Sequence, residues 1–323
     1  MTPFESSPGV FVDRATREQI ILTAVHSRDF DAPFAIVTSK AKGHTGQFRV
    51  FADALKVGGV RVNVSAALEQ QIADLLGCCL LTPMLADLRW LQRGTKLQPM
   101  PRPITLDTKS MVDQSAKVDA AIAKAGGAQG IVDTVGKHWV ISRQLPNHVG
   151  RAENYGWHFV GPTFDGQKFG AAVTPPLRLI QDQGWAHDAS HTDYSQICVL
   201  VDRRCMVDGV QRDLRDVLRD PELSWLVSHD GPLSIVRQPG VPEVDPMSAT
   251  PPRPVAVAMN GDDPIHQILE RMRIKPESKR ETIGAVAGCT IGVTIGFQFG
   301  GFVPAFIGGF IGSVAGKFIA KKV

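Results

Sequence analysis

Residues 195–209, SQICVLVDRRCMVDG, carry one of the clearest strand patterns in the chain. An apolar run at 197–201 is followed by mixed polar and apolar residues, and Asp208-Gly209 is a turn dipeptide typical of β-hairpins. The stretch therefore predicts a buried strand that ends in a tight turn. Cys198 lies among apolar residues in this strand, which is typical of a small buried hydrophobic residue and not of a nucleophile.

Further strands and helices are expected on both sides of this stretch. KHWVISR at 137–143 and NYGWHFVG at 154–161 have the composition of strands, and QFRVFADALKVGGVRVNVS alternates around Gly58-Gly59, which predicts a hairpin. Ser65 is the expected N-cap of a helix that ends at Gly77, and Pro83 lies in the first turn of the next helix. The chain is therefore predicted to have an α+β fold. The helix with Pro83 is expected at 82–94, and three further helices are expected at 110–127, 212–220 and 221–228.

The composition argues against several classes of protein. The chain has 323 residues with a formal charge of +3 and no run of Lys or Arg, so nucleic-acid binding is not expected. Its five cysteines lack CxxC spacing, so neither a disulfide scaffold nor a cysteine zinc site is indicated. The first residues lack the basic and apolar regions of a signal peptide. We expect a protein made in the cytoplasm and carried out of it by another route.

The sequence divides into four predicted regions. Residues 1–134 are an N-terminal α+β region, and residues 135–237 are a β-rich region with the candidate active site. Residues 238–260 are a linker, because the stretch QPGVPEVDPMSATPPRP holds six prolines and few apolar side chains. Residues 261–323 contain a short amphipathic helix and then an uncharged glycine-rich segment. The first two regions are expected to form a globular module.

The glycine-rich segment has a period of four residues with one gap at Pro304. On a helix this spacing places the glycines on one face, where small residues let helices pack closely inside a bilayer. We expect a membrane-inserting hairpin bent around Gly300, Gly301 and Pro304; a single kinked span and a helix pair buried in the protein or its oligomer are the alternatives. The segment resembles the glycine-zipper regions of membrane-inserting bacterial and phage proteins, including delivered toxins and virion proteins. The packing residues are Gly284, Gly288, Gly292, Gly296, Gly300, Gly308, Gly312 and Gly316.

Both tyrosines of the chain lie beside histidines, in ENYGWHF at 153–159 and HDASHTDYS at 187–195. Here, and from about 45 to 232, the chain resembles an uncharacterised group of bacterial and phage-associated proteins. Members of that group share a YGWH stretch and, further along the chain, a histidine with an Asp-Tyr-Ser sequence that begins six residues after it. They have another histidine at the position where this chain has Gln196. The resemblance implies candidate residues without a reaction. They are Tyr155, Gly156, Trp157, His158, His187, Asp193, Tyr194 and Ser195.

A metal site is the first interpretation of these residues. His158, His187 and Asp193 offer two imidazoles and a carboxylate, a set that suits zinc with one open position for water. Glu153 or His191 would then serve as the base. Zinc peptidases that cut peptidoglycan cross-links use a similar ligand set, although their spacing differs.

The second interpretation is a metal-free catalytic site. His187 or His158 would activate Ser195, and Asp193 would orient the imidazole. Ser195 lacks a GxSxG elbow, however, and it precedes an apolar strand.

The third interpretation is structural. Tyr155, Trp157, Tyr194 and the histidines would form a hydrogen-bonded aromatic core or a carbohydrate-binding face. Four further histidines are isolated in the sequence and are assigned no role: His26, His44, His229 and His266.

A chain without a signal peptide that ends in a membrane-seeking segment suggests delivery by a machine. We expect a protein of a phage tail or virion, or one loaded on a contractile secretion machine, that passes into the target-cell envelope and inner membrane. The leading hypothesis is an injected peptidoglycan hydrolase, with the membrane, peptidoglycan, further copies of itself and virion or secretion-machine components as partners. The alternative is a non-enzymatic virion, baseplate or channel-forming protein whose tail oligomerises in the inner membrane. A third possibility is a cytosolic protein anchored permanently in that membrane.

Overall fold

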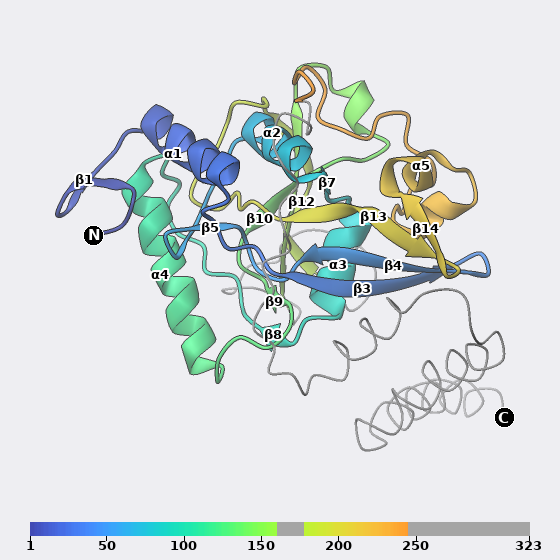
Figure 1. Cartoon of the computed structure of the whole chain (residues 1–323), viewed down its shortest axis with the longest axis horizontal. Coiled ribbons are helices and arrows are strands. Elements are labelled where there is room, and N and C mark those ends of the chain that lie inside the picture. The colour runs from blue at the N-terminus through green and yellow to red at the C-terminus, as the bar shows by residue number, and fades with distance from the viewer. Residues whose placement is uncertain (160–177, 245–323) are drawn as a thin grey trace, which may run out of the picture. The chain divides into compact units, whose positions relative to one another are not determined.

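The computed structural model describes residues 1–159 and 178–244, which have a mixed α+β fold (Figure 1). All the described residues lie within one compact unit. The linker beyond residue 244, the amphipathic helix and the glycine-rich segment lie outside the described residues. Within the part that the structure describes, no helix is both long and apolar enough to span a bilayer.

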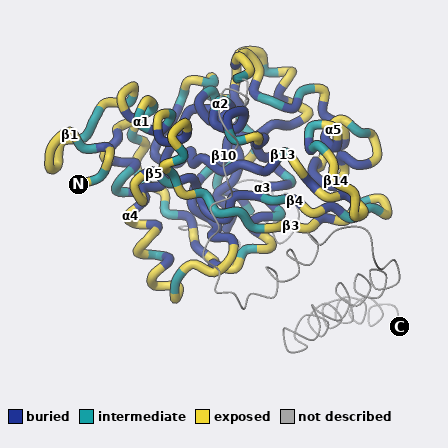
Figure 2. Tube along the Cα trace, viewed as in Figure 1, coloured by how far each residue is buried: buried dark blue, intermediate teal, exposed yellow. Residues whose placement is uncertain are grey.

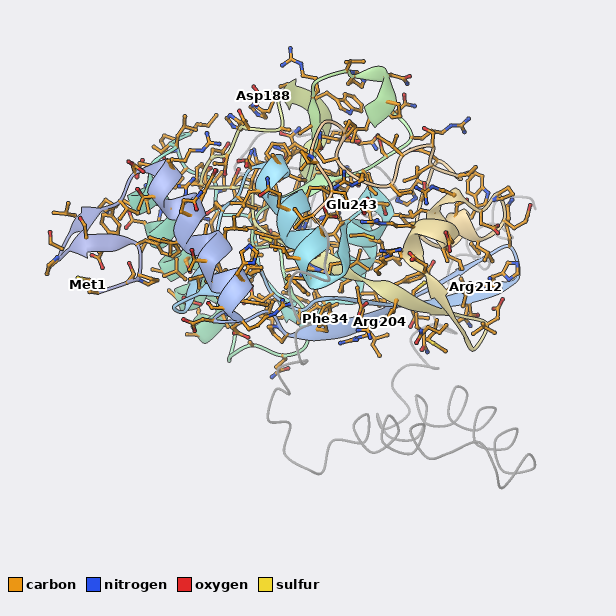
Figure 3. All side chains as sticks on the ribbon, turned by 45° about the horizontal axis from the view of Figure 1, so that its top comes forward. Met1, Phe34, Asp188, Arg204, Arg212 and Glu243 are labelled. Atoms are coloured by element: carbon orange, nitrogen blue, oxygen red, sulfur yellow. The ribbon has the colours of Figure 1, made fainter. Side chains whose placement is uncertain are left out.

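β13 (Leu200–Val207) is the central strand of a five-stranded antiparallel sheet, as its apolar composition predicts. It pairs with three strands, and Figure 1 shows it beside β4 and β3. Asp208 and Gly209 take φ angles of 51° and 79°, which confirms the predicted turn into β14. Arg204 and Arg212 project from this hairpin (Figure 3). The other strands are β14 (Val210–Asp213), β4 (His44–Phe51), β3 (Phe34–Ala41) and β7 (Cys78–Leu80).

The predicted boundary at residue 134 does not separate two sheets. β4 and β7 come from the first region, and both pair with β13 from the second region. The two regions therefore share one sheet and lie within one compact unit. Strand pairing therefore crosses the predicted boundary.

A second antiparallel sheet has the order β10-β11-β12. β10 (Lys137–Val140) and β11 (Ala152–Phe159) confirm the two strands expected around 137–143 and 154–161. β12 (Arg178–His187) lies in the region predicted to be β-rich but was not singled out as a strand, because it is polar and Leu179 is its only fully buried residue. β11 is the central strand, because it pairs with both β10 and β12, and it is buried along its whole length. Figure 2 shows the buried interior around β10.

Capping residues fix most helix ends. The Ser65 side chain accepts a hydrogen bond from the Leu68 N–H, and Gly77 takes a left-handed φ of 63°, so α2 (Ala66–Leu76) has its predicted bounds. α3 (Pro83–Leu91) begins after Thr82 as expected but ends before Gly94. The remaining helices are α1 (Arg14–Ser27), which the sequence pattern missed, α4 (Thr108–Lys124), α5 (Leu214–Arg219) and two 3-10 helices, Leu145–Asn147 and Leu223–Leu226. The short strands are β1 (Glu5–Ser7), β2 (Val10–Phe11), β5 (Lys56–Val57), β6 (Val60–Arg61), β8 (Thr95–Lys96) and β9 (Val132–Asp133).

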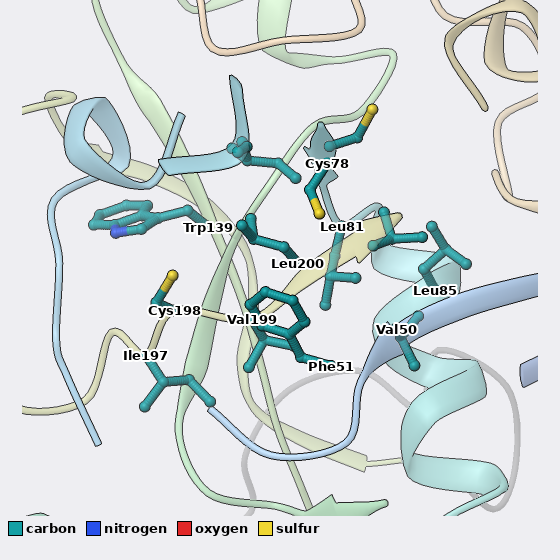
Figure 4. Close-up of a cluster of buried hydrophobic side chains, with 14 of the residues drawn as sticks. Val50, Phe51, Cys78, Leu81, Leu85, Trp139, Ile197, Cys198, Val199 and Leu200 are labelled. Atoms are coloured by element: carbon teal, nitrogen blue, oxygen red, sulfur yellow. The ribbon is translucent and has the colours of Figure 1, made fainter. Parts of the chain in front are cut away.

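A continuous apolar core lies between the two sheets and α2 and α3, and Figure 4 shows part of it around Val199, Phe51 and Leu81. Cys198 is fully buried in this core. Burial and the nearby Glu69 and Cys78 side chains raise the pKa of its thiol well above the usual value. The thiol therefore stays protonated, which agrees with its interpretation as a buried hydrophobic residue.

Gly136 holds β10 close to the segment that carries the Asp-Tyr-Ser motif. A Cβ atom at Gly136 would lie 2.6 Å from the Ser195 carbonyl oxygen and 2.7 Å from Ile197 Cγ2. We expect Gly136→Ala to lower the free energy of unfolding by about 1–3 kcal/mol, since the clash is with backbone and a buried side chain. Urea unfolding followed by tryptophan fluorescence measures the change. Gly184→Ala is the matched control, because its nearest contact is the flexible end of Gln181; equal stability of the two variants would contradict the close approach.

Candidate functional site

Asp87 is the centre of a buried hydrogen-bonded cluster between α3 and β11, called here the Asp87 cluster. Its Oδ1 atom accepts a hydrogen bond from the Tyr155 hydroxyl at 2.8 Å and lies 2.7 Å from His158 Nε2. Its Oδ2 atom lies 2.7 Å from His229 Nε2. The Trp90 ring, one turn further along α3, stacks on His158 with ring centroids 5.6 Å apart. One carboxylate of α3 therefore contacts two side chains of β11 and a third side chain, His229, from much later in the chain.

The backbone at Gly156 and Trp157 explains why Tyr155 and His158 reach the same carboxylate. In a regular strand, residues three apart point to opposite faces. Here Gly156 has a φ of 122° and Trp157 a φ of 59°, so the regular alternation is broken between the two side chains. A positive φ at a tryptophan is strained and is maintained only where the surroundings require it. The YGWH motif thus specifies a local distortion that brings Tyr155 and His158 together.

The charge states in the Asp87 cluster follow from its hydrogen bonds. Burial opposes ionisation of Asp87, but the hydrogen bonds from His158, His229 and Tyr155 prevail and lower its pKa. Burial and the Asp87 charge raise the pKa of Tyr155. At neutral pH the carboxylate is therefore ionised and the phenol is neutral, so Tyr155 is a donor to Asp87.

His229 is the exposed member of the Asp87 cluster. Its side chain is 40% exposed, whereas the His158 side chain is fully buried. His229 is isolated in the sequence and was assigned no role, but in the structure it contacts Asp87, from which 142 residues separate it. His44, also regarded as isolated, lies 2.6 Å from Asp208 at the β13–β14 turn. In the sequence, Asp87 is distinguished only as an acidic residue within the leucine-rich stretch 82–94.

Several buried polar atoms without a hydrogen-bond partner among the described residues lie next to the Asp87 cluster. Both ring nitrogens of His138 lack a hydrogen-bond partner among the described residues, as do both terminal nitrogens of Arg89. Burial, together with the Arg89 charge, lowers the pKa of His138 well below its usual value, so this imidazole is neutral. Arg89 faces the buried Asp133 carboxylate, with 3.6 Å between Nη1 and Oδ2. This polar interior is where ordered water is expected.

The Asp-Tyr-Ser motif forms a separate buried turn. The Ser195 hydroxyl donates to Asp193 Oδ1 at 2.5 Å, and the Ser195 N–H donates to the same atom at 2.7 Å. Gln196 closes the turn, since its Oε1 accepts from the Asp193 N–H and its Nε2 donates to Asp193 Oδ2. The Tyr194 hydroxyl bonds to the Arg102 backbone. At the position where the resembling group has histidine, Gln196 thus has a structural role.

His187 and His191 stack on each other beside this turn. Their ring centroids are 3.7 Å apart with an interplanar angle of 6°, and His191 Nε2 lies 3.8 Å from Asp193 Oδ2. Burial and the neighbouring His191 and Lys137 lower the pKa of His187. The His187 imidazole is therefore predominantly neutral at neutral pH.

The proposed zinc ligands do not come together. On the β11–β12 ladder His187 is level with Ala152, whereas His158 is level with Leu179. Six residues along a strand correspond to about 20 Å, so His158 cannot share an ion with His187 and Asp193. No group of three or more His, Cys, Asp or Glu side chains is arranged around a possible metal position in residues 1–159 and 178–244. Zinc binding stays a prediction that needs another ligand set.

The proposed triad around Ser195 does not form either. The Ser195 hydroxyl bonds to Asp193, and neither His158 nor His187 contacts it in the structure. Ser195 is 2% exposed. Tyr155, Trp157 and Tyr194 are buried, as the interpretation of an aromatic core requires.

Glu153 is buried and its Oε2 atom accepts a hydrogen bond from Ser142 at 2.5 Å. Burial raises the pKa of Glu153 to about 7, and the Asp230 charge acts in the same direction. A folded-state pKa above the ordinary 4.5 stabilises the protein below pH 4.5, and this contribution is lost as pH rises through 7. The carboxyl group is therefore protonated in the fold at mildly acidic pH.

We expect Glu153→Gln, which mimics the protonated acid, to abolish this pH dependence. The Glu153 pKa is raised by about 2.5 units, which corresponds to at most about 3 kcal/mol of unfolding free energy. The variant should therefore be more stable than the wild type at pH 8 and similar to it at pH 4. Urea unfolding at several pH values measures this. Glu222→Gln, at an exposed position, is the control. A parallel pH dependence in wild type and Glu153→Gln would refute the raised pKa.

Comparison with protein-family models, with curated proteins and with solved structures finds no match to this chain. The eight glycines predicted to pack in a membrane, from Gly284 to Gly316, lie outside the described residues. The chemistry of the Asp87 cluster must therefore be inferred from its own residues.

Proposed function

We propose that the protein is an envelope-acting hydrolase in which Asp87 and His229 form the acid–base pair. The observation that supports this is the 2.7 Å contact between the buried Asp87 carboxylate and the half-exposed His229 imidazole. A buried carboxylate that orients an accessible imidazole is the arrangement that hydrolases use to move a proton. Tyr155 and His158 hold the other carboxylate oxygen and fix its orientation.

The proton transfers follow from this geometry. Because ionised Asp87 only accepts hydrogen bonds, His229 carries its proton on Nε2 and keeps a lone pair on Nδ1. Nδ1 removes a proton from a water molecule as the water oxygen attacks an amide carbonyl carbon. The same nitrogen then returns the proton to the leaving amine as the C–N bond breaks. Asp87 stabilises the imidazolium between these steps.

Peptidoglycan is the substrate that fits the rest of the chain. Its cross-links are amides, and the uncharged glycine-rich segment is suited to a bilayer that lies beneath the cell wall. A hydrolase carried in a virion or secretion machine would meet the wall first and the inner membrane next. Its partners would be peptidoglycan, the membrane, further copies of the chain and the delivery machine.

The test is digestion of purified peptidoglycan by the full-length chain in mild detergent. We expect soluble fragments whose masses and new amino groups report amide cleavage, and heat-unfolded protein as the control should release none. Addition and chelation of zinc in parallel reactions determines whether a metal contributes. Absence of fragments under every condition would overturn the hydrolase.

A non-enzymatic structural role in a virion or in a membrane channel is the second candidate. The burial of Tyr155, Trp157 and Tyr194 favours it, because these motif residues stabilise the fold and do not face a ligand. Dye leakage from liposomes and ring-shaped oligomers, without peptidoglycan cleavage, would support this role over the hydrolase.

A further inference from the structure

A cavity of about 300 Å³ lies between α5 and the segment 234–243, away from the residues of the Asp87 cluster. Three arginines line it: Arg215 and Arg219 from α5, and Arg237 from the facing segment. Ile235, Val236 and Pro239 supply apolar wall. A cavity with an apolar wall and a few convergent charged groups is the usual form of a small-molecule site.

Asp74 of α2 fixes two of the three arginines from behind. Its carboxylate is 1% exposed and lies 3.3 Å from Arg215 Nη2 and 2.7 Å from Arg237 Nη2. It also accepts hydrogen bonds from Gln70 and from the Val244 backbone N–H. Since Asp74 is held by four donors, the two guanidinium groups are positioned before any ligand arrives, which lowers the entropic cost of binding.

The charges of the cavity are not balanced. Asp74 offsets one of the three arginines, which leaves two positive charges. Arg219 makes no ion pair or hydrogen bond among the described residues, and the Nε atoms of Arg215 and Arg237 are buried without a partner. Glu243 offsets one charge through a 2.8 Å contact with Arg215 Nη1.

Glu243 occupies the place that a ligand anion would take. Its side chain is 58% exposed, and Arg215 is its only side-chain partner in the described part of the chain. An exposed ion pair of this kind contributes little, so a better anion can displace it. Once Glu243 leaves, two unneutralised guanidinium groups remain, and these match the charge of a dianion.

We propose that this cavity binds a phosphate monoester, with the phosphate on Arg219 and Arg215 in place of Glu243 and the organic part against Ile235 and Pro239. Guanidinium groups pair with phosphate oxygens through two parallel hydrogen bonds. A monocarboxylate would do no more than replace Glu243 at one arginine, whereas a phosphate monoester satisfies both. The phosphate is carried either by a soluble metabolite or by a lipid headgroup.

The test is isothermal titration calorimetry of the full-length chain with glycerol 3-phosphate, with glycerol and acetate as controls. We expect binding of the phosphate alone, weakened about 10- to 100-fold by Arg219→Gln, because a charge-assisted contact is lost. Arg212→Gln is the matched control, since Arg212 projects from β14 at a distance from Glu243 (Figure 3). Glu243→Gln should bind more tightly than the wild type, because it removes the competing carboxylate.

Sedimentation with vesicles that contain or lack phosphatidic acid identifies the source of the phosphate. Binding that depends on phosphatidic acid and on Arg219, without binding of glycerol 3-phosphate, assigns a lipid headgroup, and the converse assigns a soluble monoester. The proposal is overturned if neither ligand binds, or if Arg219→Gln and Arg212→Gln bind equally well. Weaker binding by Glu243→Gln would refute the displacement step.

Discussion

Replacement of His229 by glutamine is expected to lower the rate of peptidoglycan cleavage by about 10²- to 10⁴-fold, the usual contribution of a general acid–base residue. Glutamine can still donate a hydrogen bond from its side-chain amide to Asp87 Oδ2, so the cluster keeps its geometry. It cannot accept and return a proton near neutral pH. The rate of fragment release from purified peptidoglycan, measured at saturating substrate, gives the effect.

The control for this variant is His26→Gln. His26 is an exposed histidine near the end of α1 without a side-chain hydrogen bond in the described residues. Its replacement should leave cleavage and stability unchanged. Equal cleavage rates for His229→Gln and His26→Gln would remove His229 from the mechanism, even if the protein proved to be a hydrolase.

The sequence predicted those parts of the fold that depend on local contacts. The bounds of α2 follow from Ser65 and Gly77, and the β13–β14 turn follows from Asp208-Gly209. These features depend on neighbouring residues, so a short window of sequence contains all the information they need. α1 has a local capping residue, since the Asp13 side chain accepts a hydrogen bond from the Thr16 N–H, but its apolar pattern is weak because a charged residue, Arg17, is among the four that it buries.

The candidate site could be predicted only in part. The YGWH motif marks Tyr155 and His158 as candidate residues, and in the structure both contact one carboxylate. Asp87 lies 71 residues before His158 and His229 lies 142 residues after Asp87, so no spacing rule could join them. The proposed zinc set failed for a related reason. Strand register decides whether His158 meets His187, and register depends on the whole sheet.

Asp87→Ala is expected to lower the free energy of unfolding by about 3–5 kcal/mol, the cost of removing one partner from a buried charged network. The Tyr155 hydroxyl and His158 Nε2 would lose their acceptor inside the protein. Strain at Trp157 adds to the effect, because the bonds that compensate its φ of 59° would be gone. Urea unfolding followed by tryptophan fluorescence measures the loss.

Two further variants separate the possible causes. Asp29→Ala removes an exposed aspartate at the end of α1 and should change stability by less than about 0.5 kcal/mol. Asp87→Asn keeps the shape and one acceptor oxygen but loses the charge, so it should fall between wild type and Asp87→Ala. If Asp87→Ala unfolds at the same urea concentration as Asp29→Ala, the contacts of Asp87 with Tyr155 and His158 do not hold α3 against β11. The distorted YGWH backbone would then need another source of stability, and the Asp87–His229 pair would lose the rigid support that orients its imidazole.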